Sequence, residues 1–492
     1  DQNVTLSDVV VDAADLVTVN ARTTGTVDAT SVATITGLAS EVDTVLSVGA
    51  GEISGLGTQA VTLDDVLLAA SSLNTVNGKT SGVVNAGTAT TITGTLADIN
   101  TAYAANVAGT VSGLGNESVT VTNDAGVSAA DMNTLNGYTT GTVTAASVLT
   151  TTGSATDVSA LYDAQGSGVD GLGNEAVTLS GTGATAAELN NIAAKTSGQI
   201  DIDTVTTITG TASATITALN DGQIDNGGDQ AVTLTDETLA ATVLTELDGD
   251  TTGIVNAASV TTLTGATADL NTAYAANAAG TVSGLTNEAV TTSDATIADA
   301  ATLVTLDAYT SGVIDATSID TITGSAADLA SVYGSAGIDN FGDDDIVTVT
   351  GVTAAAADLN TIAAGNALQI TVAGTVVTVT GSASDLATMY NNADAPGDGI
   401  TGLGDEAVTV TDTTSAAADL NSINTDTTGV MDTATNVTTI TGSVSGLQAL
   451  QTAIGAGQVS AKSNYAVTIS DASVDAGDIN AMSGIGVGKT TG

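Results

Sequence analysis

A short alternation of β-branched and small residues recurs along the chain. Its most regular form is Thr-Ile-Thr-Gly, which stands at residues 34–37, 91–94 and 207–210. Alternation at a period of two is typical of a strand with one buried face. We therefore expect the central isoleucine or valine to point into a core and the two flanking threonines to point outward.

A second pattern follows these strands, with apolar residues at the spacing of an amphipathic helix. Leu270, Ala273 and Tyr274 stand at positions i, i+3 and i+4, which predicts a short helix with one buried face. A Ser/Thr-x-x-Asp/Glu capping signal opens many of these segments. It occurs at Ser128…Asp131, Thr95…Asp98, Ser154…Asp157, Thr185…Glu188, Ser325…Asp328 and Ser382…Asp385. Asn-Gly or Asp-Gly at 77–78, 136–137 and 248–249 predicts the helix stop.

The two patterns repeat together at a regular interval. The glycine that ends the strand motif recurs at Gly37, Gly94, Gly153, Gly210, Gly265, Gly324, Gly381 and Gly442. Successive glycines are roughly 58 residues apart, and each period divides into two related halves of roughly 29 residues. Both halves are predicted as strand, short helix, strand. A period of this size indicates a stacked architecture in which each unit buries its apolar face against its neighbours.

The predicted fold is a β-solenoid of about 29-residue units within a double repeat of about 58 residues, mixing strands with short helices. Equivalent residues of successive repeats are expected to form ladders. Whether one half-repeat or a whole double repeat makes one turn stays open. The approximate double repeats are 4–60, 61–118, 119–176, 177–231, 232–289, 290–346, 347–407 and 408–466, with a partial one at 467–492. Because residues 1–6 match 229–234 and residues 489–492 match 79–82, we interpret 1–492 as one continuous array cut mid-repeat from a longer one.

The charge of the chain limits the classes of molecule that it can bind. Five basic residues stand against 54 acidic ones, for a formal net charge of −49. Nucleic acid is excluded as a natural partner, since phosphate binding needs clustered Lys and Arg. Anionic membrane surfaces are disfavoured for the same reason. Self-repulsion on this scale calls for screening salt or bound divalent cations.

Composition also bears on catalysis and on membranes. The chain has no Cys and no His, so the usual zinc, haem and iron–sulfur ligands and the Ser-His-Asp and Cys-His nucleophiles are excluded. We expect no enzyme. No apolar run approaches the length of a bilayer span, so no direct membrane insertion is expected. The apolar content is 42% with 2% aromatic residues, which predicts a folded chain with a core of small aliphatic side chains.

Acidic turns recur once per double repeat, at the junction with the next. Calcium takes six to eight oxygen ligands from Asp, Asn and turn carbonyls, so these turns are candidate Ca²⁺ sites, with solvated loops as the alternative. Neither an EF-hand loop nor a Gly-Gly-x-Gly-x-Asp nonapeptide occurs in the chain. The candidate residues are Asn116, Glu117, Asn174, Glu175, Asn287, Glu288, Asp343, Asp344, Asp345, Asp405 and Glu406.

Four of the five basic residues occupy one repeat position, just before Thr-Thr-Gly or Thr-Ser-Gly. We call this position the basic slot; it holds Arg22, Lys79, Lys195 and Lys489, and in other repeats Tyr138, Tyr309, Asp250 and Asp426. In a chain so poor in cations, this restriction suggests pairing with carboxylates of a neighbouring coil or of another chain. The alternative is a surface position that tolerates any long side chain, where an exposed ion pair contributes about 0–1 kcal/mol.

Two further sets of residues recur in register. Tyr103, Tyr162, Tyr274, Tyr333 and Tyr390 each stand nine residues after the repeat glycine, and Leu46 and Leu219 occupy the same slot. A core packing role is expected, with a carbohydrate-stacking stripe as the alternative. The Thr-x-Thr pairs resemble the ice-binding face of some solenoid antifreeze proteins, although threonine is also simply a strand former that tolerates water.

Three phrases carry a resemblance to a known class of proteins. They are Ala-Ala-Asp-Leu-Asn-Thr-Ile at 356–362, Lys-Thr-Ser-Gly-Val-Val-Asn at 79–85 and Thr-Ile-Thr-Gly-Ser-Ala-Ala-Asp-Leu at 321–329. They resemble repeats in giant cell-surface proteins of marine cyanobacteria, one of which is required for swimming without flagella. The resemblance implies secretion, a very long parent chain and a structural role, and it carries no catalytic residues to this chain.

The sequence therefore predicts a structural segment of a large secreted acidic protein that forms an extracellular fibre, sheath or surface layer, stabilised by cations and by self-association. An adhesin stalk or binding module that recognises glycan or ice is the main alternative. A carboxylate-based polysaccharide lyase or glycosidase is a third candidate. Only the segment from Asp339 to Asp345, with Phe341, has the irregular cluster such an enzyme would need.

Overall fold

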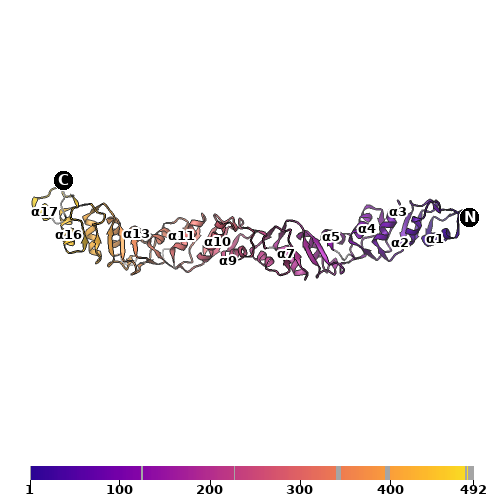
Figure 1. The fold of residues 1–492 in the computed structure, drawn as a ribbon, viewed down its shortest axis with the longest axis horizontal. Helices are drawn as coiled ribbons and strands as arrows, with labels where there is room; N and C mark the ends of the chain where they lie inside the picture. The colour runs from indigo at the N-terminus through magenta and orange to yellow at the C-terminus, as the bar shows by residue number, and fades with distance from the viewer. Residues whose placement is uncertain are drawn as a thin grey trace. The chain divides into compact units, whose positions relative to one another are not determined.

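The computed structural model describes residues 2–122, 126–225, 228–297, 299–339, 345–393, 399–482 and 485. Internal contacts divide the chain into two units: residues 1–235 with 249–256, and residues 236–248 with 257–492. Each unit is built from the same alternation of one short helix with two or three short strands (Figure 1). The predicted tandem repetition is therefore confirmed as a repetitive α/β array.

The helices are short and follow one another along each unit. Those of the first unit are α1 (Ala13–Arg22), α2 (Ala39–Ser47), α3 (Ala70–Lys79), α4 (Leu96–Ala108), α5 (Ala129–Tyr138), α6 (Ala155–Asp163), α7 (Ala186–Lys195) and α8 (Ala212–Leu219). α9 (Ala241–Asp250) has residues in both ranges. Those of the second unit are α10 (Thr267–Ala279), α11 (Ala300–Tyr309), α12 (Ala326–Gly334), α13 (Ala356–Gly365), α14 (Ala383–Ala393), α15 (Ala417–Asp426), α16 (Val444–Gly455) and α17 (Ala476–Ala481).

The strands are two to five residues long and pair in parallel, each with the next but one along the chain. Two sheets of the first unit are β2 (Val10–Asp12), β4 (Thr34–Gly37), β6 (Ala60–Leu63), β8 (Val84–Asn85) and β10 (Val111–Ser112), and β7 (Leu67–Ala69), β9 (Thr91–Gly94), β11 (Ser118–Val121), β13 (Val143–Thr144) and β15 (Val169–Asp170). Two sheets of the second are β22 (Thr238–Ala240), β24 (Thr262–Gly265), β26 (Ala289–Thr292), β28 (Ile314–Asp315) and β30 (Ile338–Asp339), and β27 (Thr296–Ile297), β29 (Thr321–Ser325), β31 (Ile346–Thr350), β33 (Ile370–Val372) and β35 (Ile400–Thr401).

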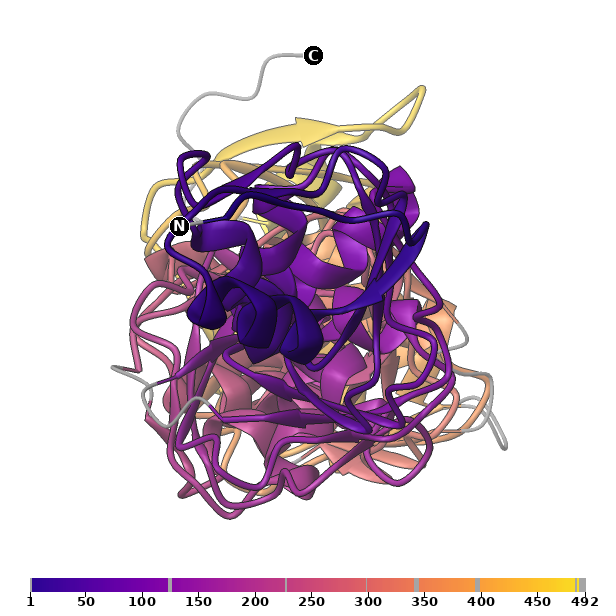
Figure 2. The ribbon, with the colours of Figure 1, turned by 90° about the vertical axis from the view of Figure 1, so that its right-hand side faces the viewer.

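The half-repeat is the unit that stacks. Consecutive helices pack against each other, as α1 does on α2 and α2 on α3 in the first unit, or α12 on α13 in the second. Figure 2 views the first unit from its end, with its first helices and strands nearest the viewer. The two halves of a double repeat are therefore successive layers. They are not two sides of one wider layer, which answers the question that the sequence left open.

The expectation that equivalent residues form ladders is confirmed for some strand pairs and wrong for others. β4 and β6 each open a half-repeat and pair with each other, and β8 and β10, which follow their helices, also pair. However, β6 pairs with β8, although the two strands stand at different positions of the half-repeat. The partners along this sheet include Val10–Thr34, Thr34–Ala60, Val61–Val84 and Val84–Val111. Each of these steps along the chain is shorter than the half-repeat.

This short step explains why the sheets stop at five strands. β2 ends immediately before α1, β6 ends seven residues before α3 begins, and β10 starts three residues after α4 ends. Along the sheet, each successive strand therefore lies farther in the chain from the start of the helix that follows it. The last strand of the sheet comes shortly after the end of a helix. A new sheet has begun by then: β7 precedes β10 in the chain and belongs to the next sheet.

The strands face as the alternation predicts. Ile35, Ile92 and Val379 are fully buried, whereas the threonines on either side of Ile35 are half-buried on the other face. The repeat glycine lies against the first alanine of the preceding helix: a Cβ built at Gly37 would stand 3.3 Å from the Cβ of Ala13. Close approach of strand and helix therefore accounts for the pairing of glycine with alanine in these motifs.

The helix starts are confirmed, and the predicted stops are wrong by a turn. In all six capping signals the Ser or Thr Oγ accepts the backbone N–H three residues on, at 3.0 to 3.3 Å. The Asn-Gly and Asp-Gly pairs lie inside the last turns of α3, α5 and α9, and each helix ends at the following residue. Helical glycine costs only about 1 kcal/mol, so packing against the neighbouring helices can override that signal.

Side chains also join one layer to the next. The Nδ2 of Asn74 on α3 donates to the carbonyl of Asp98 in the first turn of α4 at 2.9 Å, and Asn133 on α5 bonds Asp157 of α6 in the same way. The Oδ2 of Asp65 accepts the N–H of Ala39, at the start of α2, at 2.7 Å. The Asp65 carboxylate thus satisfies one of the N–H groups that the start of α2 leaves unpaired.

Candidate functional site

The glutamates of the acidic turns are hydrogen-bonded to the tyrosines that stand nine residues after the repeat glycine. The phenolic O–H of Tyr103, on α4, donates to Glu117 Oε2 at 2.9 Å, and Tyr274, on α10, donates to Glu288 at 3.1 Å. Tyr162 donates to Glu175 and Tyr390 to Glu406 in the same way. All eight side chains are at most 3% exposed. The predicted core role of these tyrosines is confirmed, while Tyr333 is half-buried.

The same carboxylate also accepts hydrogen bonds from backbone N–H groups of the turn that precedes it. Glu117 accepts the N–H of Gly115 at 2.8 Å through the oxygen that also binds Tyr103. The other oxygen of Glu117 is 3.1 Å from the same N–H. Glu175 accepts the N–H groups of Gly173 and Asn174 at 2.8 and 3.1 Å. A buried carboxylate is tolerated when donors surround it, and here the donors come from one turn and one tyrosine.

The Thr-Thr-Gly motif fastens the next layer to this turn. Thr139 Oγ1 donates to the backbone carbonyl of Glu117 at 2.8 Å and accepts the N–H of Gly141 at 3.0 Å. A Cβ built at Gly141 would overlap the carbonyl of Glu117. The motif therefore needs its glycine for close backbone approach. We call the set of junction glutamate, slot tyrosine and Thr-x-Gly turn the clasp.

The clasp separates the two residues of each acidic dipeptide. Asn116, Asn174, Asn287 and Asp405 are exposed, whereas the glutamate that follows each is buried. The carboxylate and its neighbouring side chain therefore lie on opposite sides of the turn. Binding of Ca²⁺ stays a prediction. Asp343 and Asp344, together with Phe341, lie outside the described residues, and Asp345 is 5% exposed.

The residues at the two clasp positions change together from repeat to repeat. Where the slot holds Leu46 or Leu219, the junction residue is Gln59 or Gln230 in place of glutamate. The Oε1 of Gln59 still accepts the turn N–H of Gly57 at 2.8 Å, and its Nε2 donates to the Gly55 carbonyl at 2.6 Å. An amide supplies its own donor, so it needs no tyrosine. Sequence inspection could have found this joint substitution, but the separation of the two positions along the chain hid it.

The last full repeat exchanges the two positions. Gln451 occupies the tyrosine slot, and Tyr465 stands where the other repeats have Glu or Gln. Tyr465 is fully buried; its hydroxyl lies 2.8 Å from Thr433 Oγ1 and accepts the N–H of Lys462 at 2.9 Å. In this repeat, therefore, an aromatic ring stands at the junction position, and a half-buried polar residue stands in the slot.

Burial and the carboxylate act together on the tyrosine. Burial, first, and the nearby Glu117 charge raise the pKa of Tyr103 above its ordinary value of 10.0. Burial and the hydrogen bond to Glu175 raise the pKa of Tyr162 likewise. The pKa of Tyr333 is raised by burial and by the charge of Asp345. Tyr103 and Tyr162 are therefore neutral and donate to their glutamates throughout the ordinary pH range.

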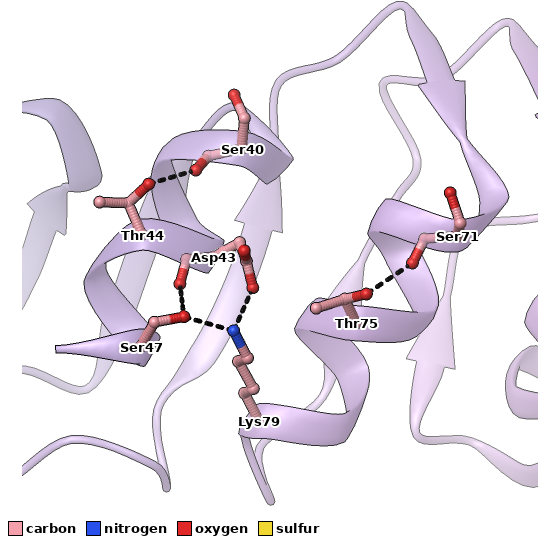
Figure 3. Close-up of polar contacts among 7 residues, drawn as sticks. All are labelled: Ser40, Asp43, Thr44, Ser47, Ser71, Thr75 and Lys79. Carbon is pink, nitrogen blue, oxygen red and sulfur yellow. Dashed lines mark hydrogen bonds and ion pairs between the residues drawn. The ribbon is translucent and has the colours of Figure 1, made fainter. Parts of the chain in front are cut away.

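One member of the basic slot bridges two helices. Lys79, the last residue of α3, lies 2.5 Å from Asp43 Oδ1 on α2 and also bonds Ser47 (Figure 3). Both charged side chains are about one-third exposed, so solvent screening limits the pair to about 0–1 kcal/mol. Pairing with a neighbouring layer is thus observed for Lys79 within the chain.

Three other slot residues, each the last of its helix, also contact the preceding helix or the residue after it. Tyr138 stacks on Tyr103 with ring centroids 5.9 Å apart, and Tyr309 stacks on Tyr274 at 6.1 Å. Asp250 accepts a hydrogen bond from Asn220 at 3.0 Å. Arg22 and Lys195 are exposed, and Lys489 lies outside the described residues. A role for the slot in contacts with another chain remains a prediction.

The described parts of the chain bring no three His, Cys, Asp or Glu side chains together as a metal-binding group. Within them, too, no helix has both the length and the apolar character needed to cross a bilayer. Comparison with known proteins found no family model that matches the chain and no curated protein similar to it.

Proposed function

We propose that the chain is a non-catalytic structural segment of a large secreted acidic repeat protein that builds an extracellular fibre, sheath or surface layer. The clasp is the observation that carries this proposal. At four junctions it joins a double repeat to the next layer through the same few polar groups, of which Glu117 and Thr139 are typical. A chain whose recurrent polar residues hold its layers together is suited to a mechanical role.

The finer architecture belongs to the same proposal. Strand pairing between successive layers and packing between successive helices support a closed β-solenoid coil. Repulsion among the acidic side chains, at a net charge of −49, favours salt or divalent cations as stabilising partners. Calcium at the exposed Asn and Asp of the junction turns is the specific version of this hypothesis.

Electron microscopy of the purified chain and of the native material tests the structural role. We expect fibres or sheets with a regular axial repeat, and lateral association that increases when salt or calcium is added. Single particles under every ionic condition would contradict self-assembly. For the calcium version, a chelator should lower the melting temperature at fixed ionic strength, and an unchanged melting temperature would leave only diffuse screening.

The sheets support the ice-binding alternative unevenly. On the outer face of one sheet Thr36 pairs with Thr62, but the same column continues to Asn85 and Ser112. In another, Thr264 and Thr291 lead to Asp315 and then Asp339. The threonine columns differ in length from sheet to sheet: these two hold two threonines each, whereas Thr323, Thr348, Thr371 and Thr401 form a column of four.

A further inference from the structure

A shallow, open groove lies between α10 and α11 in the second unit. It has a volume of about 450 Å³ and is lined by Asn271, Thr272, Ala275, Ala301, Thr302, Thr305 and Tyr309. None of these side chains is charged, although the chain carries 54 acidic residues. The alanines leave room between the two helices, and Tyr309 is 40% exposed at one end.

The polar groups of the groove are mostly acceptors. The hydroxyls of Thr272, Thr302 and Thr305 donate to carbonyls of their own helices at 2.7 to 2.9 Å, so their oxygens are left to accept. The Nδ2 of Asn271 donates to the carbonyl of Thr302 at 2.9 Å. Its Oδ1 is buried, so Asn271 joins the two helices and the threonine oxygens are the acceptors left for a ligand.

The aromatic ring is held in place. Tyr309 stacks on the buried Tyr274 with a centroid distance of 6.1 Å and an interplanar angle of 7°. Tyr274 is in turn fixed by its hydrogen bond to Glu288. A clasp therefore positions an exposed ring beside a groove of acceptors, and little side-chain entropy remains to be lost when a ligand packs against the ring.

We propose that this groove binds a neutral sugar unit of a glycan. The ligand that fits must be uncharged, rich in hydroxyl donors for the threonine oxygens, and apolar on one face for the tyrosine ring. An anionic sugar would be repelled by the acidic surface, and a cation would prefer carboxylates, which the groove lacks. A pyranose ring meets all three requirements.

Sugar binding can be measured by saturation-transfer NMR on the whole chain, with cellohexaose, maltohexaose and mannohexaose as probes and polygalacturonate as the acidic comparison. We expect transfer to the ring C–H protons of at least one neutral probe and none to polygalacturonate. Tyr309→Ala should weaken binding by about tenfold, the size of one aromatic contact. Tyr309→Phe should retain binding, since the ring alone is required.

Two further variants separate binding from folding. Ala275→Leu fills the groove from an exposed position on α10 and should abolish transfer with an unchanged melting temperature. Tyr138→Ala removes the corresponding stack in the first unit, where Asp131 stands in place of Thr302, and should leave the neutral-sugar signal intact. Absence of transfer to all three neutral probes, or transfer that survives Ala275→Leu, would overturn the proposal.

Discussion

The junction glutamate is buried and held by a tyrosine hydroxyl and by turn N–H groups. For Glu117 these partners are Tyr103 and Gly115. Removal of such an acceptor leaves buried donors without partners, at a cost of about 1–3 kcal/mol for each. Because Gln59 satisfies its turn beside Leu46, the chain contains two solutions to the same local problem.

The two solutions predict coupling between the positions. Tyr103→Leu and Glu117→Gln should each destabilise the chain, whereas the double variant recreates the Leu46–Gln59 pair. We expect it to be more stable than the sum of the single effects by about 0.5–3 kcal/mol, the range for residues in contact. Urea unfolding of the four proteins measures this coupling. Strict additivity would show that the recurrence of the pairs has no energetic basis.

The raised tyrosine pKa values predict a loss of stability in alkali. An unfolded chain ionises its tyrosines near pH 10, and the folded chain holds Tyr103 and Tyr162 neutral to higher pH. Their contribution is fully present below about pH 10 and is lost as the pH rises through the folded-state pKa. Melting temperatures across this range, with tyrosinate absorbance recorded in parallel, check the expectation. Ionisation of every tyrosine near pH 10 with no change in melting temperature would contradict it.

At the scale of elements, backbone contacts between layers decide which glycines are required. Gly141→Ala should destabilise the chain by about 1–3 kcal/mol or more, because the new Cβ overlaps the carbonyl of Glu117. Gly137→Ala, four residues earlier in the last turn of α5, meets open space and should stabilise the helix by about 0.5–1 kcal/mol. Opposite shifts of the denaturation midpoint are the expected result, and equal shifts would refute the close approach.

Helix capping between layers is testable with two adjacent aspartates. Asp65 accepts the first N–H of α2, whereas Asp64 beside it is exposed. Asp65→Ala should cost about 0.5–2 kcal/mol, as for other N-terminal caps, and Asp64→Ala should have little effect. Thermal unfolding of the two variants measures the difference. A similar loss in both would mean that net charge, and not the cap, is responsible.

Local signals predicted the elements well, and they predicted the pairing of the strands only in part. Ser128…Asp131 and Thr-Ile-Thr-Gly act within a few residues, so the sequence displays them directly. The pairing of β6 with β8 depends on how far the chain travels around one layer, which local alternation does not specify. The clasp was missed for a related reason: Tyr162 and Glu175 belong to different parts of the repeat, and their partnership is visible only by comparing repeats.

At the scale of the whole molecule, charge repulsion opposes folding. Only five basic residues offset 54 acidic ones, and the Debye length shortens from about 30 Å at 0.01 M salt to about 10 Å at 0.1 M. We therefore expect the melting temperature to rise with sodium chloride, and to rise further with a divalent cation at equal ionic strength. Calorimetry across a salt series measures this effect. A melting temperature that falls on first addition of salt would contradict it.

The short pairing step between strands also affects how damage would spread. Strands β7 to β10 belong alternately to two sheets, one ending at β10 and the other beginning at β7. The two sheets therefore overlap along this part of the chain. A tear that opens one sheet along its hydrogen bonds meets the middle of the next sheet within two layers. Rupture under load would then advance in small steps, because each overlapping sheet has to be broken separately.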